Sequence, residues 1–189
     1  MRIYLMAVGT RDPFWMERDK AIVYFTGILK EHGPNYLEKD LPLKEGPILT
    51  FFDRQPVKAE DHIVLIATKG EPPVVKRPTD RCGEETKSLL LRTKPHLKEE
   101  NIHLEFLENI DPSELDRLYD PMRKLVEEVL QKRIPNHAEA EELIVNVSPG
   151  TPQIQASWYI MAHFGHLTKP FADRPPEVRL LQVKEAVEG

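Results

Sequence analysis

Short apolar runs recur along the chain, and they have the length and composition of buried strands. Leu143–Val147 is β-branched and apolar on both faces, which is typical of a strand in a parallel sheet that is covered on two sides. Ile3–Val8 and His62–Thr68 have the same character. Ile102–Leu107 and Val178–Val183 are predicted as the third and the last strand. The pattern therefore predicts five strands, spread over the whole length of the chain.

Stretches with apolar residues at helical spacing lie between these strands. They are Trp15–Lys30, Glu84–Lys98, a helix that starts at Asp111 and runs to Leu130, and Pro152–Phe164. Gly46–Asp53 is ambiguous, because Pro47 can open a helix while the run is also short enough for a strand. Strands that alternate with helices predict an α/β protein with a Rossmann-like, mostly parallel sheet flanked by helices and joined by right-handed crossovers.

The helix predicted over Pro152–Phe164 is apolar on nearly every side, with Trp158 and Tyr159 among its side chains. A helix that is apolar all round is buried. We expect this burial in the core of the domain, in a dimer interface, or in both.

Length and composition fit one domain that spans residues 1–189. The chain ends soon after its last predicted strand, so we expect no effector domain within it, and the chain either stands alone or is part of a longer protein. Cys82 is the only cysteine, which excludes an intrachain disulfide and a cysteine zinc site. Neither an apolar run of membrane-span length nor a secretory signal pattern is present, so we predict a cytoplasmic protein without a membrane partner.

Charge is unevenly distributed along the chain. The net charge of −5 argues against a domain that coats duplex nucleic acid. Lys69–Lys94 holds seven Lys and Arg against four Asp and Glu, whereas Glu99–Glu142 holds five against thirteen. We expect the basic stretch to face an anion and the acidic stretch to form a solvated surface.

The loop after Leu143–Val147 has the chemistry of a phosphate site. Gly150 permits a sharp turn, Thr151 is a natural N-cap, and Pro152 suits the first position of a helix. A helix that starts directly after a tight turn offers backbone N–H groups to a phosphate. An ordinary strand-to-helix connection has many of the same features, and the chain lacks both the Gly-x-Gly-x-x-Gly pattern of dinucleotide-binding folds and the P-loop pattern.

A second loop follows the first predicted strand and reads Gly9-Thr10-Arg11-Asp12-Pro13. By itself it could be a turn that Asp12 caps and Pro13 closes. In an open α/β sheet, however, the carboxyl ends of parallel strands face one crevice. We therefore expect Thr10 and Arg11 to lie near Ser148 and Thr151. The long connection that begins at Lys69 has no periodicity and is basic, so it is expected to be functional or disordered.

The string from Asn146 to Gln153, Asn-Val-Ser-Pro-Gly-Thr-Pro-Gln, resembles the signature loop of CARF domains. These are CRISPR-associated Rossmann-fold sensors of cyclic oligoadenylates that act in antiviral defence. Asn146, Ser148, Gly150 and Thr151 match the family pattern, and Gly-Thr-x-Asp-Pro after the first strand is also frequent in the family. Pro152 departs from the Lys of many members, and it is familiar from the branch that controls RNA-repair transcription. The resemblance also favours a helix at Pro47.

The resemblance implies a homodimeric sensor that binds a cyclic oligoadenylate across its two-fold axis and controls an attached or separate effector. An even-numbered ring matches the symmetry of such a dimer, which makes cyclic tetra-adenylate the first choice. No cofactor and no metal are implied. The candidate ligand-binding residues are Gly9, Thr10, Arg11, Asp12, Lys69, Asn146, Ser148, Pro149, Gly150, Thr151 and Gln153.

Three alternatives stay open at this point. The pocket could cleave its ligand as a metal-independent ring nuclease, with a ribose 2′-OH attacking the adjacent phosphate. A binding module is favoured, and enzyme activity stays an open alternative. The domain could instead sense the signal for an RNA-repair transcription regulator. A Rossmann-like enzyme acting on a mononucleotide is the third alternative, and it would bind one ligand in each chain.

Overall fold

The computed structural model describes residues 1–183, and its centre is a five-stranded parallel sheet with the strand order β6-β5-β1-β7-β8. The strands match the five apolar runs of the sequence. They are β1 (Arg2–Ala7), β5 (His62–Lys69), β6 (Ile102–Glu108), β7 (Glu142–Asn146) and β8 (Glu177–Leu181). The predicted α/β Rossmann-like class is therefore confirmed.

The sheet reverses its direction of growth at β1. From β1 the chain adds β5 and β6 on one side, and it then crosses over to add β7 and β8 on the other side. β1 pairs with β5 in the register Leu5↔Val64 and with β7 in the register Leu5↔Val145. The loops after β1 and β7 therefore leave the sheet as neighbours in opposite directions, and such a switch point opens a crevice at the carboxyl ends of the strands.

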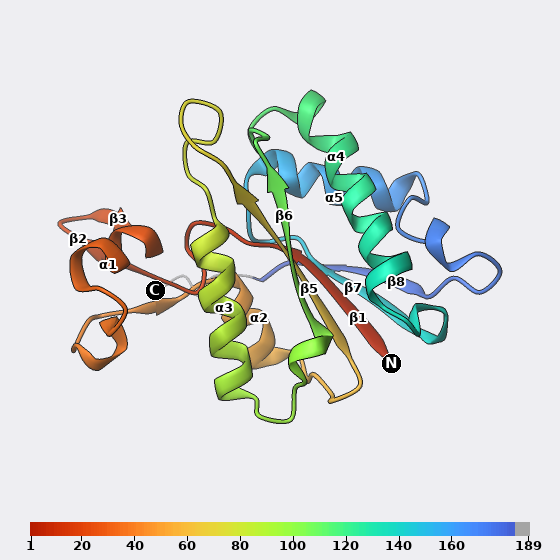
Figure 1. Ribbon diagram of the computed structural model, residues 1–189, viewed down its shortest axis with the longest axis horizontal. Helices are drawn as coiled ribbons and strands as arrows, with labels where there is room; N and C mark the ends of the chain where they lie inside the picture. Colours follow the sequence, from red (N-terminus) through yellow and green to blue (C-terminus); the bar gives the residue numbers. More distant parts are fainter. Residues whose placement is uncertain (184–189) are drawn as a thin grey trace.

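Helices cover both faces of this sheet (Figure 1). The helices α1 (Phe25–His32), α2 (Pro47–Arg54) and α3 (Asp80–Thr93) lie on one face, and α4 (Leu115–Glu128) and α5 (Pro152–His163) lie on the other.

Side chains along β1 alternate between the two cores. Leu5 packs into the core that includes Trp158 of α5, whereas Tyr4 and Met6 pack into the core that includes Phe25 of α1. All of these side chains are fully buried, so both faces of the central strand are covered by apolar side chains. This is the physical reason why its sequence is an uninterrupted apolar run.

Several short helical turns lie between these elements. They are the 3₁₀ turns η1 (Tyr36–Glu38), η2 (Glu99–Asn101), η4 (His137–Glu139) and η5 (Lys169–Phe171), and the π-helical turn η3 (Val129–Arg133), which continues α4.

The prediction of a helix over Trp15–Lys30 is wrong in its first half. This part forms an antiparallel hairpin of β2 (Phe14–Arg18) and β3 (Ala21–Val23), and β4 (Lys44–Glu45) pairs with the other edge of β2. Asp19 and Lys20 form the two-residue turn with φ values of 51° and 63°. Positive φ at both central positions matches the right-handed twist of a hairpin, whereas it interrupts a helix. The helix begins only at Phe25.

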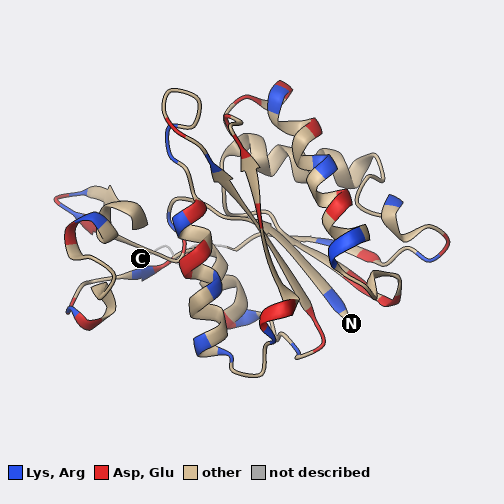
Figure 2. Cartoon of the chain, viewed as in Figure 1, with Lys and Arg blue, Asp and Glu red and all other residues tan. Residues whose placement is uncertain are grey.

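The acidic stretch of the sequence forms solvated surface, as expected, since none of its Asp and Glu residues is buried. Figure 2 marks both acidic and basic positions along the ribbon of α4. Arg123 pairs with Asp120 at 3.5 Å and with Glu127 at 3.5 Å, which are the spacings at which helical side chains meet. Among residues 1–183, no helix combines the length and the apolar character needed to cross a bilayer.

Two histidines pack together near the starts of β5 and β6. His62 Nδ1 lies 3.0 Å from His103 Nε2, and the two rings are stacked. Burial lowers the pKa of His103 from 6.5 to about 4, and it also lowers the pKa of His62. A hydrogen bond between two ring nitrogens needs one donor and one acceptor, so at least one of the rings is neutral.

We therefore expect His103 to lower the free energy of unfolding as the pH decreases from about 6.5 towards 4, measured as the difference between the wild type and a variant without this histidine. In this window the unfolded chain binds a proton at His103 that the folded protein does not bind, which costs of the order of 2 kcal/mol. Urea unfolding at several pH values tests this. His103→Gln should remove this contribution, so the stability of the variant relative to the wild type should increase as the pH decreases through this window. The same slope for His103→Gln and the wild type would contradict the assignment.

Candidate functional site

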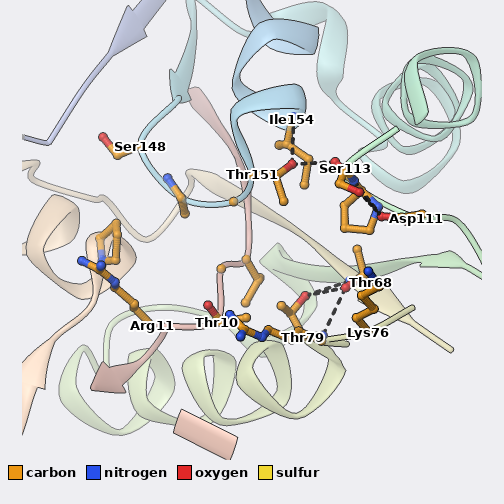
Figure 3. Close-up of a pocket in the computed structure, with 17 residues that line it drawn as sticks. Thr10, Arg11, Thr68, Lys76, Thr79, Asp111, Ser113, Ser148, Thr151 and Ile154 are labelled. Atoms are coloured by element: carbon orange, nitrogen blue, oxygen red, sulfur yellow. Dashed lines mark hydrogen bonds between the residues drawn. The ribbon is translucent and has the colours of Figure 1, made fainter. Parts of the chain in front are cut away.

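A cavity of about 610 Å³ opens at the switch point of the sheet, and the connections that follow four of its strands line it. Its lining residues are Val8, Gly9, Thr10 and Arg11 after β1; Pro47 at the start of α2; Thr68, Lys76, Arg77 and Thr79 around the β5–α3 connection; Asp111, Pro112 and Ser113 after β6; and Ser148, Pro149, Gly150, Thr151 and Ile154 after β7. Figure 3 shows Arg11 and Ser148 on one side of this cavity and Lys76 and Asp111 on the other.

A buried carboxyl group fixes the loop after β1 through hydrogen bonds to the backbone. Asp12 is fully buried, and its Oδ2 accepts a hydrogen bond of 2.9 Å from the Gly9 N–H. Its Oδ1 accepts a bond of 3.0 Å from the N–H of Ile48, in the first turn of α2. Burial raises the pKa of Asp12 to about 7, against the opposing effect of these two donors. Asp12 thus joins the loop to α2, and the lining of the cavity does not include it.

The loop after β7 has the turn and the cap that its sequence predicts. Gly150 has a φ of +92°, in the region that glycine adopts without strain. Thr151 is the N-cap of α5, because its Oγ1 accepts a bond of 3.2 Å from the Ile154 N–H. The same hydroxyl donates to the Pro112 carbonyl at 2.6 Å, which ties this loop to the one after β6. The start of α5 is therefore fixed by two loops at once.

The two loops that the sequence singled out are in contact. A Cβ at Gly9 would lie 3.0 Å from the backbone nitrogen of Gly150, so the backbones meet with no room for a side chain between them. Thr10, Arg11, Ser148 and Thr151 consequently line the same cavity, as the geometry of a parallel sheet predicts.

Ser148 also contacts the chain beyond β8. Its hydroxyl oxygen accepts a hydrogen bond from the Val183 N–H, and its carbonyl accepts a bond of 2.9 Å from Gln155 Nε2. The loop is thus bound both to α5 and to the segment that leaves the last strand.

The β5–α3 connection brings two cationic side chains to the cavity. A pair of threonines closes its base: the Thr68 N–H donates to Thr79 Oγ1 at 2.9 Å, and the Thr79 N–H donates to the Thr68 carbonyl at 2.9 Å. Lys76 and Arg77 lie within this closed loop and line the cavity, and Figure 2 colours basic positions along the ribbon of the connection. With Arg11 they give the cavity three cations, against the one carboxylate of Asp111.

Three further sequence candidates are absent from the lining of this cavity. Asn146 is fully buried beneath the turn, where its Oδ1 accepts a bond of 3.1 Å from the Ser148 N–H. Lys69 is exposed at the end of β5, with its Nζ 5.3 Å from the ring centroid of Phe106. Gln153 lies in the first turn of α5 but does not line the cavity.

Sequence reasoning left out Lys76, Arg77, Asp111 and Ser113. The basic composition of the β5–α3 connection was the available signal for the first two. For the others, the signal was the Asp-Pro-Ser turn at the end of a parallel strand. There Asp111 Oδ1 accepts bonds of 2.9 Å and 2.6 Å from the N–H and the hydroxyl of Ser113, and these bonds lower the pKa of the Asp111 carboxyl.

The chemical groups of the cavity suit an anion that also carries hydroxyl groups. The first turn of α5 and three cationic side chains can meet negative charge. Asp111 and the hydroxyls of Thr10 and Ser113 can accept or donate hydrogen bonds. Within residues 1–183, no group of three or more His, Cys, Asp and Glu side chains could hold a metal ion.

No protein-family model matches the sequence, and no curated protein matches it. Among solved structures, the chain is similar to Enterococcus italicus Csm6 bound to cyclic hexa-2′-fluoro-hexa-dAMP, with a TM-score of 0.55 and 18% sequence identity. The match covers 100% of this chain, which spans only 34% of the length of that chain. At this identity the likeness shows the fold alone, and it agrees with the Rossmann-like fold predicted from the sequence.

We expect Thr151→Ala to lower the free energy of unfolding by about 1–2 kcal/mol, because it removes the cap of α5 and the bond to Pro112. Thr151→Ser keeps the hydroxyl and should restore most of this loss. As a control, Thr168→Ala removes a hydroxyl whose bond to Gly165 is exposed, and it should change stability little. Urea unfolding of the three variants measures the effect, and equal stability of Thr151→Ala and the wild type would show that the cap is dispensable.

Proposed function

We propose that this domain is a sensor that binds a cyclic oligoadenylate in the cavity at the switch point of its sheet. One observation carries the proposal: in a CARF-type fold, the loops after β1 and β7 meet at this cavity, which a helix N-terminus and three cations line. The Csm6 structure of similar fold holds a cyclic adenylate analogue, which supports the same class of ligand here.

The phosphates of such a ring would bind to the start of α5 and to the three cations. The Gly150 turn lets the backbone approach a phosphate closely, and the dipole of α5 favours negative charge at this end of the helix. Arg11, Lys76 and Arg77 would supply charge-assisted hydrogen bonds from two sides of the cavity. In this proposal Ser148, Pro149 and Thr151 contact the ligand directly, whereas Asn146 and Asp12 support the loops.

We further propose that the sensor is a homodimer and that the ring lies across its two-fold axis. Trp158 of α5 is fully buried in the core, but Tyr159 and Phe164 are 46% and 67% exposed. Tyr159 lies within α5 and Phe164 at its C-terminal end, and large aromatic side chains exposed on one helix are suited to a second protomer. Cyclic tetra-adenylate is the preferred ring, because its symmetry matches an isologous dimer, and an attached or separate effector would respond to the bound state.

Calorimetry with cyclic tri-, tetra- and hexa-adenylate and with linear tetra-adenylate tests the proposal. We expect one ring to bind per dimer and the linear form to bind far more weakly. One ligand per chain would favour an enzyme acting on a mononucleotide instead. Mass spectrometry of the ligand after incubation distinguishes a sensor from a ring nuclease, since cleavage by a ribose 2′-OH leaves a 2′,3′-cyclic phosphate. An absence of heat and of thermal shift with every ring would overturn the proposal.

Arg11→Ala should weaken binding of the ring by roughly ten- to hundredfold per protomer, because it removes a charge-assisted hydrogen bond. Arg18→Ala is a suitable control, since Arg18, at the exposed end of β2, pairs with Glu31 of α1 at 2.6 Å and does not line the cavity. Calorimetric affinities of both variants check this expectation. If Arg11→Ala folds and binds the ring as tightly as the wild type does, the ligand occupies another site.

A further inference from the structure

The small antiparallel sheet has no part in the proposed function so far, yet one aromatic side chain in it and one directly after it lie beneath arginines of the cavity. Arg11 Cζ lies over the ring of Trp15, in β2, at 4.9 Å from its centroid. Arg77 Cζ lies over the ring of Tyr24, which directly follows β3, at 4.7 Å from its centroid. The two arginines come from different connections of the main sheet, and both line the cavity.

The small sheet is fixed to the cavity loops, so these rings are held in place. The Phe25 N–H donates to the Thr10 carbonyl at 3.2 Å, which anchors the residue after Tyr24 to the loop that follows β1. Tyr36, which packs against Phe25, donates from its hydroxyl to Glu85 Oε1 on α3 at 3.0 Å. The position of Tyr24 is therefore set relative to both connections that supply the arginines.

Trp15 is fixed within the small sheet itself. It is the cross-strand partner of Lys44 in β4, and Lys44 Nζ lies 4.9 Å from the centroid of the same ring. Lys44 in turn pairs with Glu17 at 3.6 Å. The ring thus carries one cation that lines the cavity and one that does not.

We propose that Trp15 and Tyr24 are positioning residues for the ligand: they hold the guanidinium groups of Arg11 and Arg77 where these meet the phosphodiester groups of the ring. This inference rests on the proposed function and adds the small sheet to the site. A guanidinium group is planar, and its donors point outwards in its plane, so a ring against its face does not use them. Fewer side-chain conformations are then lost when the ligand binds.

Matched variants separate the aromatic face from simple bulk. Trp15→Leu and Tyr24→Leu keep an apolar side chain but remove the π-system, whereas Trp15→Phe and Tyr24→Phe keep it. We expect each Leu variant to bind the ring about three- to tenfold more weakly, and each Phe variant to bind within about twofold of the wild type. The probe is the cyclic oligoadenylate that binds the wild type most tightly, and thermal unfolding confirms that each variant is folded.

Double-mutant cycles give a result that a merely structural role would not produce. If Trp15 acts through Arg11, Trp15→Leu should have almost no effect on affinity in an Arg11→Ala background, and it should keep its full effect in an Arg77→Ala background. Tyr24→Leu should show the reverse pattern. The two cycles are independent, so either one tests the proposal if a variant of the other does not fold.

The outcomes are distinguishable. The inference is overturned if Trp15→Leu weakens binding as much in the Arg11→Ala background as in the wild type, and Tyr24→Leu does so in the Arg77→Ala background. The proposed function would still stand. The same holds if both Leu variants bind as tightly as the wild type. A wild-type protein that binds none of the rings overturns the proposed function, and this inference with it.

Discussion

The parallel pairing of β1 with β7 is the contact on which the rest of the site depends. These strands are far apart in the sequence, and their pairing in the register Leu5↔Val145 brings their loops together at Gly9 and Gly150. Because the sheet grows in opposite directions from this pair, the two loops diverge and leave a cavity between them. The pairing itself is stable because helices cover both faces of β1 with apolar side chains.

Much of this arrangement could be predicted from the sequence, because burial on both faces leaves a direct trace in it. Runs such as Leu143–Val147 identify the strands, and Gly150 with Thr151 identifies the turn and cap at the start of α5. The hairpin that begins at Phe14 could not be found in the same way. The apolar pattern of this region also fits a helical spacing. The deciding feature is the positive φ at Asp19 and Lys20, which the spacing of hydrophobic residues does not reveal.

The cationic part of the cavity was harder to predict than its two glycine turns. Lys76 and Arg77 belong to a connection without periodicity, so their place depends on the hydrogen bonds between Thr68 and Thr79 that close its base. Composition alone points to Lys69 equally well, although that side chain is exposed at the strand end. Local sequence patterns thus predict where a loop starts and how it turns, while side-chain contacts within the folded chain determine which of its residues face the cavity.

The central position of β1 has a consequence for biosynthesis. One edge of β1 can pair with β5 once the ribosome has made Ile66, but its other edge has no partner until Asn146, 80 residues later, has been made. At usual elongation rates this delay is roughly 4–16 s. During that time an apolar strand with an open hydrogen-bonding edge is a template for pairing with other chains. The strand that organises the finished sheet is therefore also the segment of the nascent chain that most needs protection from aggregation.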